Sequence, residues 1–156
     1  MRVLLSILLL GLLGSCTDFE AQERLAQENR QQGTAFLAAN GSKKGMTVRP
    51  SGLQYKVLRE GSGPKPTLSD RVTVHYRGTL IDGTEFDSSY ARGEPTSFAV
   101  AGVIPGWTEG LQLMSVGSHY CFFVPSDLAY GQKGAGDKIG PNATLAFEVE
   151  LLEINN

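Results

Sequence analysis

The fold is decided by a stretch that begins Val72-Thr73-Val74-His75-Tyr76-Arg77-Gly78-Thr79-Leu80 and continues Ile81-Asp82-Gly83-Thr84-Glu85-Phe86-Asp87-Ser88-Ser89. After a connecting loop it ends Val103-Ile104-Pro105-Gly106-Trp107-Thr108-Glu109-Gly110-Leu111-Gln112-Leu113-Met114. In the first piece β-branched residues alternate with polar ones, which predicts a half-buried strand. Asp82-Gly83 then gives a turn signal between two strand-like runs. Trp107, Leu111 and Met114 stand at i, i+4 and i+7, so the last piece predicts a short helix with one apolar face.

Further strand-like runs lie on both sides of this unit. Leu53, Tyr55 and Val57 alternate with polar residues, and residues 118–124 form another run. The clearest two-residue period lies at residues 144–151. Several strands and one short helix predict an α+β domain over residues 51–156, in which an antiparallel sheet packs on the helix.

Composition places the chain among ordinary globular proteins. It has 156 residues, of which 41% are hydrophobic and 19% charged, so we expect one domain with an appendage. The net charge is −2, which argues against a nucleic-acid partner because such proteins carry a basic surface.

The first sixteen residues predict a bacterial lipoprotein signal peptide. Their apolar core is too short to span a bilayer, which needs about 20 residues, but it has the length of a signal-peptide core. It ends Leu13-Gly14-Ser15-Cys16, which resembles a lipobox, so residues 1–16 are expected to end at a lipidated Cys16. An ordinary secretory signal is the alternative. Thr17, in place of aspartate, favours an anchor in the outer membrane of the cell envelope, facing the periplasm.

Residues 17–50 predict a helical tether and linker. The segment from Asp18 to Asn40 is rich in Ala, Gln and Glu, which favours helix, and Gly33 interrupts its pattern. Because apolar residues are sparse, two interpretations stay open. The helix is either a solvated spacer that holds the domain off a membrane, or one half of a dimer interface.

The residues predict a binding pocket rather than a nucleophile or a metal centre. The two histidines, His75 and His119, have no Cys or carboxylate at ligand spacing, and no phosphate-binding glycine motif is present. We therefore expect neither a metal nor a cofactor. Aromatic and apolar residues gather at loop–strand junctions, where each is also explained by core packing but together they predict a small-ligand pocket. They are Tyr76, Phe86, Val103, Ile104, Trp107, Tyr130, Ile139 and Phe147, with Asp87 beside them.

A series of motifs then resembles one family. They are Val74-His75-Tyr76, Asp82-Gly83, Phe86-Asp87-Ser88-Ser89, Val103-Ile104-Pro105-Gly106-Trp107, Leu128-Ala129-Tyr130-Gly131, and Asn142-Ala143-Thr144-Leu145 with Phe147. In this order they are similar to the FKBP-type peptidyl-prolyl isomerases, and the likeness covers residues 51–154. Ser51-Gly52-Leu53-Gln54-Tyr55 further resembles the bacterial branch that includes the macrophage infectivity potentiators.

The resemblance implies a five- or six-stranded antiparallel sheet wrapped around one short helix, with a pocket between them. Its floor would be Trp107, and its walls Tyr76, Phe86, Val103, Ile104, Ile139 and Phe147. The backbone N–H of Ile104 and the hydroxyl of Tyr130 would hold substrate carbonyls. Asp87 would bond the Tyr76 hydroxyl and face the twisting amide, so Tyr76, Phe86, Asp87 and Tyr130 are the implied catalytic residues.

Two positions depart from the family pattern. Thr96 stands where many eukaryotic members carry an aromatic wall, and Gly140 where many have proline. Both departures bear on affinity for rapamycin-like macrolides more than on catalysis. Phe98 is expected in the core rather than in the pocket.

The leading hypothesis is a membrane-anchored isomerase that acts on proline-containing polypeptides and assists the folding of exported proteins. A peptide-binding holdase chaperone with the same fold but no turnover is the alternative, and a purely structural lipoprotein is a third. If lipid occupies Cys16, then Cys121 is expected to be a free thiol.

Overall fold

A computed structural model describes residues 14–155, with side chains from residue 17 onward. Most of the predicted signal peptide and the side chain of Cys16 therefore lie outside the described residues. The helices are α1 (Gly14–Gly41), α2 (Ser89–Arg92) and α3 (Pro105–Leu113), with 3-10 turns η1 (Val100–Gly102), η2 (Ser126–Leu128) and η3 (Gly131–Lys133). The strands are β1 (Met46–Val48), β2 (Gln54–Arg59), β3 (Arg71–Leu80), β4 (Glu85–Ser88), β5 (Thr96–Ala99), β6 (His119–Val124) and β7 (Leu145–Asn155).

The strands form one antiparallel sheet in the order β1-β2-β6-β7-β3-β4, with β5 pairing beside β4 along β3. The predicted α+β class is thus confirmed, with seven strands in the described part of the chain rather than five or six. One addition is β1, which lies in the segment predicted as linker and pairs with the start of β2. Gly52, in the turn between the two strands, has a φ of 96°, a left-handed conformation that glycine adopts without steric cost.

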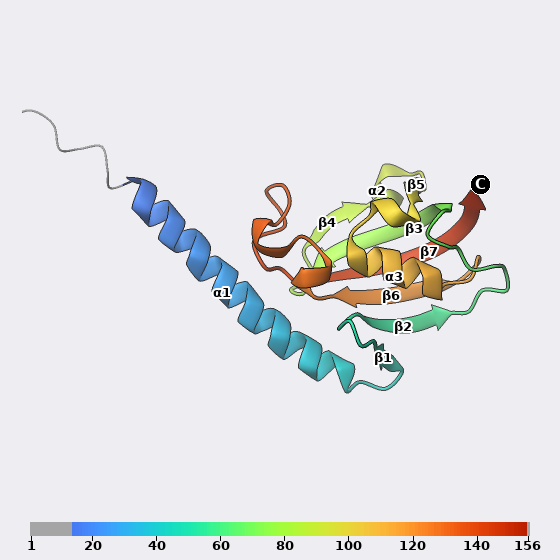
Figure 1. Cartoon of the computed structure of the whole chain (residues 1–156), viewed down its shortest axis with the longest axis horizontal. Coiled ribbons are helices and arrows are strands. Elements are labelled where there is room, and N and C mark those ends of the chain that lie inside the picture. The colour runs from blue at the N-terminus through green and yellow to red at the C-terminus, as the bar shows by residue number, and fades with distance from the viewer. Residues whose placement is uncertain (1–13, 156) are drawn as a thin grey trace, which may run out of the picture.

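The core lies between α3 and the sheet, which curves around the helix (Figure 1). The predicted apolar face of the helix is buried, with Trp107, Leu111 and Met114 at most 5% exposed. Two glycines let α3 approach the sheet closely. A Cβ on Gly106 would lie 2.5 Å from Val124, and one on Gly110 would lie 2.7 Å from Phe122.

The N-terminal helix packs against the domain along part of its length. The helix predicted for residues 18–40 is confirmed within α1, which continues through Gly33, but it is not solvated all round. Phe36 lies 5.9 Å from Phe123 between ring centroids, and Gln54 donates hydrogen bonds to the carbonyl of Leu37 while accepting one from Asn40. Within residues 14–155, no helix combines the length and the apolar content needed to cross a bilayer.

Candidate active site

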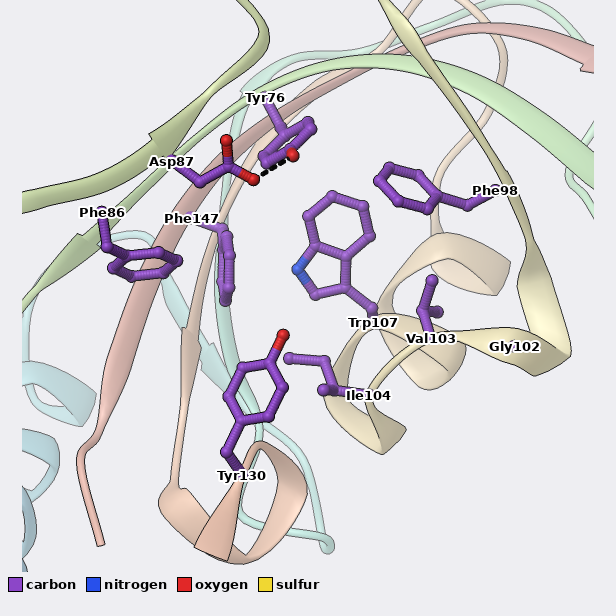
Figure 2. A pocket seen from close by; sticks show the side chains of 10 residues that line it. All are labelled: Tyr76, Phe86, Asp87, Phe98, Gly102, Val103, Ile104, Trp107, Tyr130 and Phe147. Carbon is purple, nitrogen blue, oxygen red and sulfur yellow. Dashed lines mark hydrogen bonds between the residues drawn. The ribbon is translucent and has the colours of Figure 1, made fainter. Parts of the chain in front are cut away.

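A pocket of about 310 Å³ opens where α3 meets the sheet (Figure 2). Its lining comes from β3, β4, β5, β7, the end of η1 with the residues after it, α3 and the loop after η2. The lining residues are Tyr76, Phe86, Asp87, Phe98, Gly102, Val103, Ile104, Trp107, Tyr130 and Phe147. This volume is at the lower end of the range for small-molecule sites, and it suits a single side chain with its flanking amides.

Aromatic rings pack edge to face around Trp107. Its ring centroid lies 5.2 Å from Tyr76, 5.4 Å from Phe98 and 5.3 Å from Phe147, at interplanar angles of 89°, 79° and 81°. Such perpendicular contacts are favourable because the positive edge of one ring meets the negative face of another. The Trp107 indole is 5% exposed, and its Nε1 has no hydrogen-bond partner among the described residues. The rings therefore form a rigid, apolar floor.

Gly78, which is not among the predicted site residues, makes room for two of these rings. A Cβ on Gly78 would lie 2.6 Å from Phe86 and 2.9 Å from Phe147, closer than packed atoms approach. Gly78 lies on β3 opposite both Asp87 and Phe147. The available signal was a lone glycine within an otherwise regular strand, which often marks a close approach of another group.

One polar cluster interrupts the apolar lining. The Tyr76 hydroxyl donates a hydrogen bond to Asp87 Oδ2, and Arg92 pairs with Oδ1 of the same carboxylate. Arg92 also donates to the Tyr76 hydroxyl at 3.1 Å and to Thr96 Oγ1 at 2.9 Å. Burial alone raises the pKa of Asp87, but the bonds from Tyr76 and Arg92 hold it below its usual value. The carboxylate is therefore ionised and fixed in orientation.

The chain just after Asp87 explains how this cluster is held. Ser88 caps α2 by accepting a bond from the Ala91 N–H. The buried Ser89 hydroxyl accepts from the Tyr76 N–H and bonds His75 Nδ1, both at 2.8 Å. This short helix turns the chain back, so that Arg92 at its end reaches Asp87.

Two further residues line the pocket from its loop side. Ile104 precedes α3, and the N–H groups at a helix start lack partners within the helix. Tyr130 is 42% exposed, and Figure 2 shows its hydroxyl pointing into the space that the rings enclose. An apolar cavity with a few fixed donors and one carboxylate can bind an amide-containing chain and remove water from it.

The structure brings together eight of the nine residues predicted for the site, but Ile139 is not among them. Ile139 lines a neighbouring cavity of about 210 Å³ that shares Phe86 with the pocket. Phe98, expected in the core, packs against the core and also lines the pocket. Alternation along β5 places Phe98 on the same face as Thr96, which is the signal that could have located it.

The histidines lie away from this pocket. His75 is hydrogen-bonded to Ser89 and stacks on Tyr90 at 4.7 Å between centroids. It therefore faces the side of β3 opposite to Tyr76. In the part of the chain that the structure covers, no three His, Cys, Asp or Glu side chains are grouped to hold a metal ion.

Comparison with known proteins then connects the chain to a family. The model of the FKBP-type peptidyl-prolyl cis-trans isomerase matches residues 63–152, and that of the domain amino-terminal to it matches residues 16–57. The chain is 57% identical over 129 residues to the outer membrane protein MIP of Legionella longbeachae, covering 83% of this chain and 55% of that one. It is 56% identical over 123 residues to the FKBP-type 22 kDa peptidyl-prolyl cis-trans isomerase of Escherichia coli, covering 79% and 60%.

Two solved structures have a similar fold. FkpA from Escherichia coli aligns with a TM-score of 0.83 at 43% identity, over 90% of this chain and 70% of that one. A peptidyl-prolyl cis-trans isomerase from Pseudomonas syringae aligns with a TM-score of 0.78 at 38% identity, over 84% and 96%. The chain spans about half the length of the curated relatives that it matches.

Proposed function

We propose that this chain, which belongs to the FKBP-type peptidyl-prolyl cis-trans isomerase family, accelerates rotation about X–Pro bonds in polypeptides held in the pocket. The observation that carries this proposal is the pocket, whose lining is almost entirely apolar and aromatic. Six aromatic rings line the space, and one carboxylate beside them is fixed by Tyr76 and Arg92.

The chemistry requires no bond to be made or broken. Rotation about an amide faces a barrier of about 18–20 kcal/mol because the C–N bond has double-bond character. The twisted amide loses this resonance and the polarity that water solvates in the planar form. An apolar cavity removes that water, so it stabilises the twisted form relative to the planar one.

Each lining group has a role in this proposal. The prolyl ring packs on Trp107, with Val103 and Phe147 at its sides. The Ile104 N–H and the Tyr130 hydroxyl hold carbonyls on either side of the bond. Asp87 faces the amide as it twists, in an orientation set by Tyr76, and Phe86 closes the rim. Ile139, in the adjoining cavity, contacts substrate residues beyond the proline.

An isomerisation assay without a coupling protease tests the proposal on a Leu-Pro peptide. The chain should accelerate interconversion, and Phe86→Ala or Tyr130→Ala should lower turnover while the far-UV circular dichroism spectrum stays unchanged. Peptide binding without acceleration would instead support the holdase alternative. Full activity in both variants would place the site elsewhere.

A macrolide of the rapamycin type is proposed as a second ligand of the same pocket. Thr96 lies at the start of β5 and accepts a hydrogen bond from Arg92, so a small polar group stands where an aromatic wall is common in the family. Gly140 contacts α1 rather than lining the pocket. We expect Thr96 to limit the affinity for such a ligand, so Thr96→Phe should tighten macrolide binding. Unchanged or weaker binding in this variant would contradict the proposal.

We further propose a division into residues 1–16 as lipoprotein signal, 17–50 as helical tether and linker, and 51–156 as isomerase domain. The two family models, which match residues 16–57 and 63–152, support a boundary in this region. A relative named as an outer membrane protein supports a place in the cell envelope, where clients are exported proteins. Cys16→Ser should abolish detergent-phase partitioning, and a variant that partitions like the wild type would refute the lipid anchor.

Self-association through the N-terminal part of α1 is the remaining proposal. Phe19 is 62% exposed and Leu25 is 41% exposed, so both are free to pack on a second copy. These two residues give a small apolar surface, which favours a weak dimer. Light scattering across a range of concentrations tests it, with Phe19→Ser as the variant expected to remain a monomer.

A further inference from the structure

The loop that carries Tyr130 is closed at its base. It leaves η2, passes through η3 and returns to β7, and Figure 1 shows it in dark orange beside α1. The N–H of Asn142 donates to the Gly131 carbonyl at 2.8 Å. Since Gly131 follows Tyr130 directly, this bond joins the returning end of the loop to the residue next to the pocket tyrosine.

Asn142 has a conformation and an environment that require explanation. It is the only residue other than glycine with a positive φ, 54°, among residues 14–155, and it is 4% exposed. A buried amide needs partners at both its oxygen and its nitrogen. α1 supplies both, because Arg30 Nη2 donates to Asn142 Oδ1 at 3.2 Å and Asn142 Nδ2 donates to the Ala26 carbonyl at 3.2 Å.

The same turn of α1 also binds the chain on either side of this point. Asn29 Nδ2 donates to the Pro141 carbonyl at 2.8 Å. Arg30 lies 3.8 Å from Asp127, which is in η2 just before the tyrosine. Arg30 therefore bridges the outgoing and the returning ends of the loop, at Asp127 and Asn142.

We propose that Asn142 is a positioning residue through which α1 fixes the Tyr130 hydroxyl over the pocket. The proposal rests on the proposed function, in which this hydroxyl holds a substrate carbonyl. Its consequence is that the N-terminal helix is part of the machinery that aligns the substrate, and not only a spacer. Errors of about 1 Å in such alignment can change a rate by orders of magnitude, so a loosened loop has a measurable effect.

A double-mutant cycle on the full chain separates positioning from general stability. Asn142→Gly removes the side chain but keeps the left-handed backbone and its N–H, and Arg30→Ala removes the bridge from the other side. Each should lower kcat/KM for a Leu-Pro peptide about fivefold. In a Tyr130→Phe background the same changes should have less than about a twofold effect, because the hydroxyl that they position is gone. Arg24→Ala, at an exposed arginine of the same helix, serves as the control and should leave kcat/KM unchanged.

Effects that are equal in the two backgrounds, or a wild-type kcat/KM in Asn142→Gly, would overturn the proposal. Hydrogen exchange provides a readout that does not depend on catalysis. Amides of residues 130–140 should exchange faster in Asn142→Gly and Arg30→Ala than in the wild type. Unchanged exchange overturns the inference whatever the activity, whereas faster exchange in a chain that does not isomerise refutes only the proposed function. In that case the double-mutant cycle is repeated with peptide affinity in place of kcat/KM, and the affinity is measured from the change in Trp107 fluorescence.

Discussion

Asp87 is the only carboxylate among the described residues that line the pocket, and its neighbours fix its charge. Despite the effect of burial, the bonds from Tyr76 and Arg92 keep its pKa below the usual range. Burial, followed by the bond to Asp87, raises the pKa of the Tyr76 hydroxyl. The two shifts move the titrations apart, so both groups keep one protonation state through the neutral range.

We therefore predict that kcat/KM for a Leu-Pro peptide is nearly flat between about pH 6 and 9. Because the pKa of Asp87 is lowered, this carboxyl stays ionised above about pH 6. Because the pKa of Tyr76 is raised, this hydroxyl stays protonated below about pH 9. Twisting an amide moves no proton, so the solvent deuterium effect should be small. His75→Asn should keep most of the activity, since His75 lies on the opposite face of β3.

The result that would contradict this prediction is a bell-shaped profile centred near neutrality. A several-fold deuterium effect would do the same, because it would place a proton transfer in the rate-limiting step.

Cys121 gives a second prediction at this scale. It is unpaired and half-buried on β6, and burial raises the pKa of its thiol to about 11. Only the thiolate reacts with alkylating agents. At pH 8 the folded chain should therefore react with iodoacetamide at least about 100-fold more slowly than the urea-unfolded chain. The Cys16→Ser variant makes the assay specific for one thiol, and equal rates in the folded and unfolded chain would show that the thiol is accessible and ionised.

Single residues of the site could be found from the sequence where their chemistry was distinctive. Trp107 and Phe147 stand out as aromatic residues in regular apolar patterns, although their roles came from the family resemblance. Phe98 was assigned to the core because one apolar side chain can serve both core and pocket, and a pattern does not separate the two. Gly78 was missed because its importance lies in the Phe86 and Phe147 rings that fill the space beside it.

At the scale of elements, the spacing of apolar residues predicted the helices and strands of the domain, but it did not predict how α1 packs. The helix at residues 105–113 and the strand at 145–155 follow from their apolar spacing. The docking of α1 had no such signal, because polar side chains and a glycine make much of the contact. The sequence pattern predicted an interruption of the helix at Gly33, but in the structure this residue is helical and buried against the domain.

Gly33 supplies a prediction that reverses the usual effect of helix propensity. Replacing a helical glycine by alanine normally stabilises by about 1 kcal/mol. A Cβ on Gly33 would lie 2.2 Å from Thr144 Oγ1, so either the Thr144 side chain or the helix must move. We expect Gly33→Ala to lower the free energy of unfolding by about 1–3 kcal/mol, the usual cost of overpacking, as measured by urea denaturation.

Two variants show whether the contact causes this loss. Thr144→Ala removes the nearest atom, and it should recover part of the stability when combined with Gly33→Ala. Ala35→Gly, on the exposed side of α1, should cost no more than about 1 kcal/mol, since it changes propensity alone. A Gly33→Ala variant more stable than the wild type would mean that the helix does not dock in solution.

At the scale of the whole molecule, α1 has two parts with different surroundings. From Ala26 to Asn40 it contacts the domain, through hydrogen bonds at Ala26, Asn29 and Arg30 and through packing at Phe36. The side chains of residues 17–25 are exposed, and Figure 1 shows this end of the helix extending beyond the sheet. An isolated helical segment of this length is marginal in water, so only the docked part gains protection from tertiary contacts.

This difference predicts a gradient of amide hydrogen exchange along α1. In a dilute monomer, amides of residues 17–25 should exchange close to the rate of an unfolded peptide. Those of residues 30–41 should be protected to nearly the same extent as the sheet, because they open only when the domain does.

The measurement also decides between the two interpretations of the helix. A spacer keeps the same gradient at every protein concentration, whereas a dimer formed through Phe19 and Leu25 adds protection to residues 17–25 as concentration rises. Fast exchange throughout α1 would contradict the docked helix itself, and with it the link between Asn142 and the pocket.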